Sequence, residues 1–173
     1  PMAPDDGVDV FRETPLRLAG YCNEVGESFK PLIARRVYYA SYVVSAAYVL
    51  GDAADKTQRS RRHGEAAPLF EGAKALVWQA LASVIVPGVV INRVVAVAGL
   101  ATDRLVVPRA TPRVAAYARY APTAIGLASI PLIVAPIDRA VDLLMDRAIE
   151  PLMRRAVETG KAGGGRGAES SAP

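Results

Sequence analysis

Two long runs of apolar residues constrain this chain more than any other feature of its sequence. Residues 75–91 carry no charged side chain, and residues 121–137 form a second uncharged run of the same length. A helix needs roughly 20 apolar residues to cross the hydrocarbon core of a bilayer, and flanking residues that reach the interface extend a shorter run. We therefore expect both runs to form helices that contact lipid.

A shorter apolar run precedes these two. Residues 37–50 are uncharged, are rich in tyrosine, and lie between Arg35–Arg36 and Asp52. Their length alone fits either a buried or interfacial segment or a spanning helix stretched by interfacial tyrosines and arginines. Together the three runs predict an all-α integral membrane protein with about three apolar segments, and the even distribution of Lys and Arg between its loops leaves the orientation open.

Amphipathic helices are expected at both ends of this membrane region. Apolar residues recur at helical spacing over residues 9–33, where Pro15 and Gly20 break the pattern, and again over residues 137–155. We interpret residues 1–155 as one membrane domain and residues 156–173 as a Gly/Ser-rich tail without regular structure.

Polar and breaker residues predict where the helices end or bend. Residues 51–74 have the composition of a loop. Pro87 and Gly88 predict a bend within one spanning helix, which continues to residue 101. The prolines in residues 121–137 predict a kinked or re-entrant segment.

Composition excludes several classes of function. One cysteine, Cys22, and one histidine, His63, exclude a disulfide framework and a Cys/His zinc site. The net charge of +4 suits an anionic membrane face, and without aromatic residues among the basic ones we expect no nucleic-acid binding. No nucleophile pattern or phosphate-binding glycine loop is present, so we predict neither enzymatic activity nor a cofactor.

A row of acidic residues in the last apolar segment gives one candidate metal site. Asp138, Asp142 and Asp146 are four residues apart and share a helix face, a spacing that can gather a divalent cation. Arg139 and Arg147 stand near enough to offset these charges, and a calcium site normally has a looped ligand set. We interpret the row as solvated charge and predict no metal.

Other polar residues are candidates for contact with a partner or with lipid. Asn23, Glu24 and Glu27 can form a polar contact site for a protein or a lipid head group. The alternative is that these side chains cap or solvate a helix, whose N-terminus favours carboxylates.

Asn92 and Arg93 interrupt an apolar stretch, and a charge at membrane depth usually marks a pairing or functional position. Asp138 or Asp142 can pair with Arg93, whereas the reading that we favour places Arg93 at the interface with its guanidinium in water. Trp78 is interpreted as an interface anchor.

A basic cluster lies next to an expected membrane boundary. Lys56, Arg59, Arg61 and Arg62 are a candidate site for an anionic lipid such as cardiolipin, and the alternative is a solvated loop. Small residues four apart, at Ser41 and Ser45, Ala47 and Gly51, and Ala124 and Ala128, would allow close helix packing.

Four segments of the chain, in order, resemble the mitochondrial fission process protein family over roughly residues 11–155. They are GYCNEVGESFKPLI (20–33), SYVVSAAYVLGDAADK (41–56), LVWQALASVIVPGVVINR (76–93) and IPLIVAPIDRAVDLLMD (130–146). The most specific strings are NEVGE, WQALAS, INR and PIDR. In the family a histidine often precedes the last string, and here that position is Ala135, so any role of that imidazole is absent.

The resemblance implies a multi-pass protein of the mitochondrial inner membrane that supports inner-membrane organisation and mitochondrial division without enzymatic activity. Its expected partners are membrane lipids, cardiolipin among them, and other inner-membrane proteins. The alternative is a supernumerary structural subunit of a respiratory complex or of ATP synthase. A channel is the weakest interpretation, because a single charge lies within the apolar runs.

Overall fold

Helices make up all the regular structure that the computed structural model describes, which covers residues 11, 15–62 and 67–168. The all-α prediction is therefore confirmed over this part of the chain. The α-helices in order are α2 (Arg17–Gly20), α3 (Cys22–Phe29), α4 (Arg35–Arg62), α5 (Pro68–Gln79), α6 (Val86–Ala101), α7 (Pro112–Ala118), α8 (Ala121–Leu144) and α9 (Glu150–Ala168). Between them lie the π-helices η1 (Ala80–Ile85), η2 (Thr102–Val106) and η4 (Met145–Ile149) and the 3₁₀-helix η3 (Val107–Arg109).

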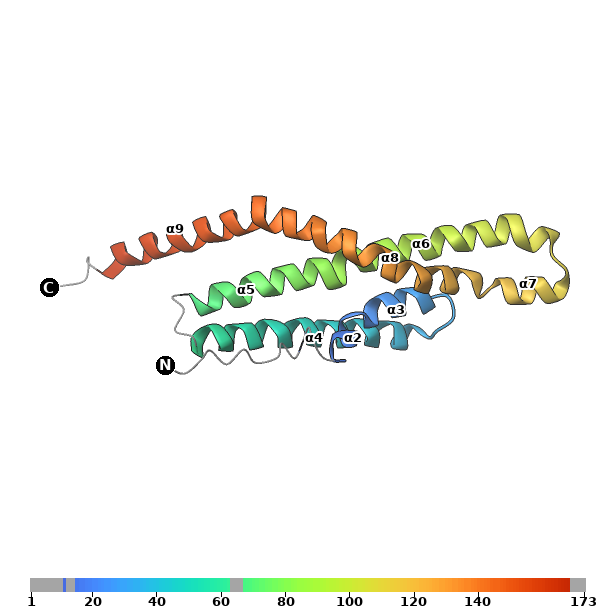
Figure 1. Cartoon of the computed structure of the whole chain (residues 1–173), viewed down its shortest axis with the longest axis horizontal. Helices are drawn as coiled ribbons and strands as arrows, with labels where there is room; N and C mark the ends of the chain where they lie inside the picture. Colours follow the sequence, from blue (N-terminus) through green and yellow to red (C-terminus); the bar gives the residue numbers. More distant parts are fainter. Residues whose placement is uncertain (1–10, 12–14, 63–66, 169–173) are drawn as a thin grey trace.

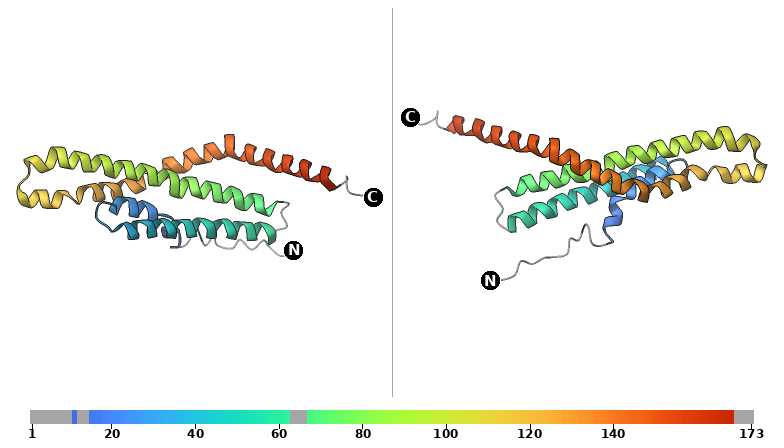
Figure 2. Two further views of the ribbon diagram at one scale, coloured as in Figure 1. Left: turned by 180° about the vertical axis from the view of Figure 1, so that it is seen from behind. Right: turned by 45° about the horizontal axis from the view of Figure 1, so that its top comes forward.

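The helices form an elongated bundle of two hairpins that share one short central helix (Figure 1). α4 packs antiparallel to α5, and α6 packs antiparallel to α8. The two-turn helix α3 contacts α4, α6 and α8, so it joins the hairpins. α9 extends away from the bundle, as all three views show (Figure 2).

Interior prolines do not stop the long helices. Each π-helix ends two residues before a proline, at Pro87, Pro108 and Pro151. Proline lacks the N–H group that continues an α-helical ladder, and the wider π turn lets the chain pass it without a break. The helical path is thus continuous over residues 68–109, in agreement with the predicted single helix around Pro87.

α8 also passes Pro131 and Pro136 without interruption, so the prediction of a re-entrant segment is wrong. The chain changes direction further on, between α8 and α9 (Figure 1). The predicted amphipathic pattern of this region is confirmed at Ile137, Val141 and Met145, which are buried.

The predicted loop over residues 51–74 is wrong for residues 51–62 and 68–74, because α4 continues to Arg62 and α5 already begins at Pro68, while residues 63–66 lie outside the described part of the chain. Ion pairs between Asp52 and Lys56 and between Asp55 and Arg59, each four residues apart, support the charged half of α4. Proline is also favoured at the first position of a helix, where its missing N–H has no partner to lose.

α9 likewise enters the glycine-rich tail and ends at Ala168, so residues 156–168 are helical where the composition predicted irregular chain. Once a helix is formed, each added residue gains one hydrogen bond without a new nucleation cost.

Two helical stretches are long and apolar enough to cross a membrane, judged by length and composition among the described residues. They are Pro68–Arg109 and Pro112–Thr159. The third predicted segment, residues 37–50, forms the first half of α4, and α4 does not meet the same criterion.

Small residues allow the helices of this bundle to approach closely. A Cβ atom on Gly26 of α3 would overlap Ser41 Oγ and lie 2.8 Å from Ser41 Cβ on α4. A Cβ atom on Gly126 of α8 would lie 2.7 Å from Val95 on α6. Of the predicted small-residue pairs, Ser41 and Ser45 face α3, whereas Ala124 and Ala128 are exposed.

We expect Gly26→Ala to lower the free energy of unfolding by about 1–3 kcal/mol, since α3 and α4 must move apart to admit the methyl group. Thermal unfolding of the detergent-solubilised protein measures the change. Gly99→Ala is the matched control, because its Cβ would meet only Pro122 Cγ at 3.9 Å. Restored stability in the double variant Gly26→Ala, Ser41→Gly would confirm the contact, and an unchanged midpoint for Gly26→Ala alone would refute it.

Candidate functional site

The interior of this bundle is unusually polar and its surface unusually apolar. Large hydrophobic side chains are exposed along α4, α6 and α8, with Leu132 74% exposed. Among the described residues, the following polar side chains are buried: Asn23, Glu24, Glu27, Ser28, Ser45, Asp52, Ser60, Gln79, Thr102 and Thr123. In a soluble domain such groups mostly stay in water. This distribution is the arrangement that suits an apolar surrounding.

α3 supplies the centre of this polar interior. Its residues Asn23, Glu24, Glu27 and Ser28 fall on one face because their spacing follows the 3.6-residue period of the helix. All four are buried against the neighbouring helices, while Val25 on the other face is 40% exposed. The residues that were predicted to contact a partner or a lipid head group therefore point into the bundle.

Glu27 is the most highly connected of these residues. Its Oε1 atom accepts hydrogen bonds from Tyr38 at 2.5 Å and Tyr42 at 2.6 Å on α4. Its Oε2 atom accepts one from Asn92 on α6 at 2.8 Å, and Lys30 lies 3.5 Å away. One carboxylate thus ties α3 to both hairpins.

Burial raises the pKa of Glu27, but the three hydrogen bonds and Lys30 outweigh it and hold the pKa below the ordinary value of 4.5. A carboxyl group with a lowered pKa contributes stability that is fully present above pH 4.5. That contribution is lost as the pH falls through the lower pKa of the folded protein.

Asn23 stabilises the helix around Pro87. Its Nδ2 atom donates to the carbonyl of Val84 at 3.2 Å, in the turn where proline disturbs the ladder. Its backbone N–H donates to Ser45 Oγ at 3.0 Å on α4. The absence of a side chain at Gly88 leaves room for the Tyr42 hydroxyl, since a Cβ there would lie 3.1 Å from it.

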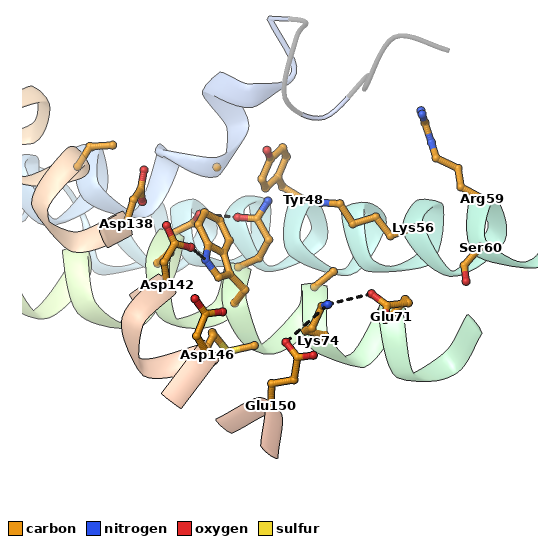
Figure 3. Close-up of a pocket in the computed structure, with 18 of the residues that line it drawn as sticks. Tyr48, Lys56, Arg59, Ser60, Glu71, Lys74, Asp138, Asp142, Asp146 and Glu150 are labelled. Carbon is orange, nitrogen blue, oxygen red and sulfur yellow. Dashed lines mark hydrogen bonds and ion pairs between the residues drawn. The ribbon is translucent and has the colours of Figure 1, made fainter. Parts of the chain in front are cut away.

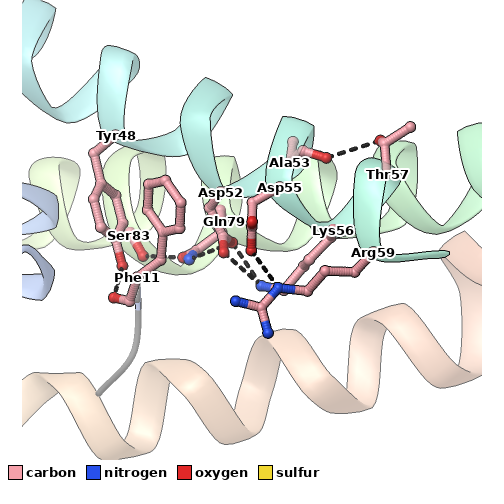
Figure 4. A network of polar contacts seen from close by, with 10 residues as sticks. All are labelled: Phe11, Tyr48, Asp52, Ala53, Asp55, Lys56, Thr57, Arg59, Gln79 and Ser83. Carbon is pink, nitrogen blue, oxygen red and sulfur yellow. Dashed lines mark hydrogen bonds and ion pairs between the residues drawn. The ribbon is translucent and has the colours of Figure 1, made fainter. Parts of the chain in front are cut away.

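A second polar network joins α4 to α5 and η1 (Figure 4). The buried carboxylate of Asp52 accepts from Lys56 at 2.7 and 2.8 Å and from Gln79 at 2.9 Å. Ser83 donates to the amide oxygen of Gln79 at 2.7 Å. Asp52 is fully buried, so its charge is balanced inside the bundle by Lys56.

A groove of about 730 Å³ runs between this network and the far end of α8 (Figure 3). One wall carries an acidic row, defined as Asp138, Asp142, Asp146 and Glu150, at one-turn spacing. The facing wall carries Lys56, Arg59 and Lys74. Trp78, predicted to be an interface anchor, lines the groove and donates its indole N–H to Asp142 at 2.7 Å.

The remaining predicted site residues lie apart from one another. Asn92 belongs to the Glu27 network, whereas Arg93 and Arg139 are exposed. No ion pair between described residues joins Arg93 to Asp138 or Asp142, so the suggested pairing is wrong. Arg59 pairs with Asp55, and Arg61 and Arg62 are exposed in the last turn of α4.

Several residues of the two polar networks were not predicted as such, among them Tyr38, Tyr42, Asp52 and Gln79, and Ser45 was named only as a small packing residue. A signal for them exists, because Tyr38, Tyr42 and Ser45 recur at spacings of four and three and so share one face of an otherwise apolar helix.

Fold and site together define a helical bundle whose polar network lies inside and whose apolar side chains face outward. The family model described as Mitochondrial 18 kDa protein (MTP18) matches residues 10–71 and 69–145. The chain belongs to this family, which confirms the resemblance noted in its sequence. The matched range contains every residue of the two polar networks.

Several relatives share most of the chain, and each carries the name Mitochondrial fission process protein 1. The protein of Danio rerio is 42% identical over 144 residues, which is 80% of this chain and 84% of the relative. The human protein is 42% identical over 146 residues, 79% of this chain and 83% of the relative. That of Caenorhabditis elegans is 37% identical over 149 residues, 79% and 84%. No solved structure matches this chain.

We expect Glu27→Ala to destabilise the protein by about 3 kcal/mol or more, because it leaves buried donors without an acceptor. In the Glu27→Ala protein, Tyr42→Phe should lower the free energy of unfolding far less than the roughly 1–3 kcal/mol that it costs in the wild type. Unfolding midpoints of the four proteins in this double-mutant cycle measure the coupling. Glu71→Ala is the surface control, since Glu71 pairs only with half-exposed Lys74. Additive effects of the two substitutions would contradict the network.

Proposed function

We propose that this chain is a multi-pass protein of the mitochondrial inner membrane that supports inner-membrane organisation and mitochondrial division. The observation that carries this function is the identity of 42% with relatives named Mitochondrial fission process protein 1 over about four fifths of the chain. The protein acts through contacts with lipid and with other membrane proteins rather than through catalysis.

The inverted distribution of polarity supports insertion into a membrane. Hydrogen bonds and ion pairs connect the helices internally, while apolar side chains cover the outside. In lipid, polar groups without internal partners are costly, and interhelical hydrogen bonds and small residues hold helices together. This bundle uses both devices.

The length of the helices supports the same arrangement. The stretch Pro68–Arg109 has 42 residues and is roughly 63 Å long, about twice the ~30 Å hydrocarbon core. Its charged residues lie towards its two ends and at Arg93. A spanning helix of this length therefore projects into water, and the groove with the acidic row belongs to one projecting end. The first half of α4 supplies the third apolar segment of the bundle.

We expect the protein to stay in the pellet when mitochondrial membranes are extracted with alkaline carbonate. It should resist added protease in intact mitochondria and become cleavable after the outer membrane is ruptured. Expressed in mitochondria of human cells that lack the related fission process protein, it should restore network division, measured as mean mitochondrial length. Gly99→Ala should act like the wild type, and Gly26→Ala less well.

Release by carbonate would refute the membrane location, and normal insertion without rescue would refute the role in division. A native gel of digitonin-solubilised membranes tests the supernumerary-subunit alternative. Comigration at fixed stoichiometry with a respiratory complex or ATP synthase would contradict an independent role, and a small separate band would support it.

We also propose that the end of α4 contacts anionic lipid such as cardiolipin. Arg61 and Arg62 are exposed in the last turn, beside the charged end of the bundle. Each Arg near an anionic surface contributes about 1 kcal/mol to its attraction.

The double variant Arg61→Gln, Arg62→Gln should therefore retain severalfold less cardiolipin after purification in mild detergent, as measured by lipid mass spectrometry. Arg154→Gln is the control, because Arg154 is held by Glu150 on α9. Equal retention by both variants would argue against this contact.

A further inference from the structure

One buried carboxyl group takes no part in either polar network. Glu24 is 1% exposed, and neither of its carboxyl oxygens has a hydrogen-bond partner among the residues that the structure describes. Glu27, one turn further along the same helix, accepts three hydrogen bonds and has a lysine beside it. The two residues share a helix and a face, yet only Glu27 is surrounded by groups that stabilise a negative charge.

The charged surroundings of Glu24 come from α8. Among the described residues, the negative charge of Asp138 acts on Glu24. α4 and α6 direct Tyr38, Tyr42 and Asn92 at Glu27, and Lys30 also pairs with Glu27. Among the described residues, an acidic group thus lies next to Glu24, while the nearby hydrogen-bond donors bind Glu27, one turn further along α3.

The groove reaches Asp138, the acidic neighbour of Glu24. Asp138 lines the inner end of the groove, and Asp142, Asp146 and Glu150 follow it outward at one-turn spacing (Figure 3). Asp142 and Asp146 are exposed, whereas Asp138 and Glu150 are half-buried, so the row offers successive proton acceptors from solvent inward. Asp138 lines the groove and also acts electrostatically on Glu24.

A proton suits Glu24 better than a metal ion does. Ca²⁺ needs six to eight oxygen ligands, and Mg²⁺ needs octahedral coordination. No group of three potential acidic, cysteine or histidine ligands comes together among the described residues. A single proton removes the charge of a buried carboxylate and supplies a donor for its neighbour.

We propose that Glu24 is a proton-binding site, filled through the acidic groove, and that its protonated carboxyl group holds α3 against α8. When the proton is lost, two negative charges face each other at this interface, which loosens. The protein is thereby sensitive to the pH on the side of the membrane where the groove opens. Glu24 has this role whether or not the protein acts in division.

Burial, with a further contribution from Asp138, raises the pKa of Glu24 from its ordinary value of 4.5 to about 8. The folded protein then holds a proton that the unfolded chain has released. The contribution of Glu24 to the free energy of unfolding therefore falls as the pH rises from about 4.5 to about 8, and it is constant above that. The contribution of Glu24 to stability is lost as the pH rises, whereas that of Glu27 is lost as the pH falls.

Infrared spectroscopy of the full chain in lipid nanodiscs tests the site directly. We expect the wild type to show the C=O stretch of a protonated carboxyl group at pH 6 and to lose it with a midpoint near pH 8. Glu24→Gln should lack this band. Asp138→Asn should move the midpoint to lower pH, because it removes the repelling charge. Asp103→Asn, which changes an exposed carboxylate of η2 outside the groove, is the matched control and should leave the midpoint unchanged.

Thermal unfolding against pH gives an independent measurement. The difference in Tm between Glu24→Gln and the wild type should grow from pH 4.5 to pH 8 and then stay constant. Absence of the band at pH 6, its persistence in Glu24→Gln, or a Tm difference independent of pH would overturn the proposal. A midpoint displaced by added Mg²⁺ or Ca²⁺ would also overturn it in favour of a cation site.

Discussion

The burial of one polar helix face is the constraint on which the rest of this structure depends. α3 is only two turns long, yet it lies between both hairpins and presents Asn23, Glu24, Glu27 and Ser28 to them. A buried polar group costs free energy unless it is hydrogen-bonded. Its partner must therefore lie at the right distance and angle, which restricts where the neighbouring helix can pack. The contacts of Glu27 and Asn23 therefore fix α4 and α6 relative to α3 more specifically than apolar packing could.

The two polar networks divide the work along the length of the bundle. The Glu27 network, through Tyr42 and Asn92, joins α3 to one half of each hairpin. The Asp52 network joins α4 to α5 and η1 near the charged end. A bundle with an apolar surface gains little from helix association by the hydrophobic effect once it is in lipid, so such networks and close glycine contacts supply its specificity. Glu24 belongs to neither network, so neither network stabilises its charged form.

Sequence reasoning anticipated local features better than contacts. The apolar runs predicted helices at residues 75–101 and 121–137, because periodicity and length are local properties. Residues 51–62 were read as loop since their composition is polar, while the four-residue spacing of Asp52 and Lys56 is what makes them helical. Glu24 and Glu27 were both selected as candidates. Their opposite surroundings depend on residues up to 65 positions away, which no local pattern encodes.

The π-helical turns give the long helices an additional property. A π turn accommodates one residue more than an α turn, which rotates everything after it by about 100° around the helix axis. η1 stands between α5, which packs against α4, and α6, which packs against α8 and α3. The continuous helix from α5 to α6 thereby packs one face against α4 and a different face against α8 and α3. Removal of one residue from η1 would turn all of α6 away from α3, although no side chain of either helix had changed.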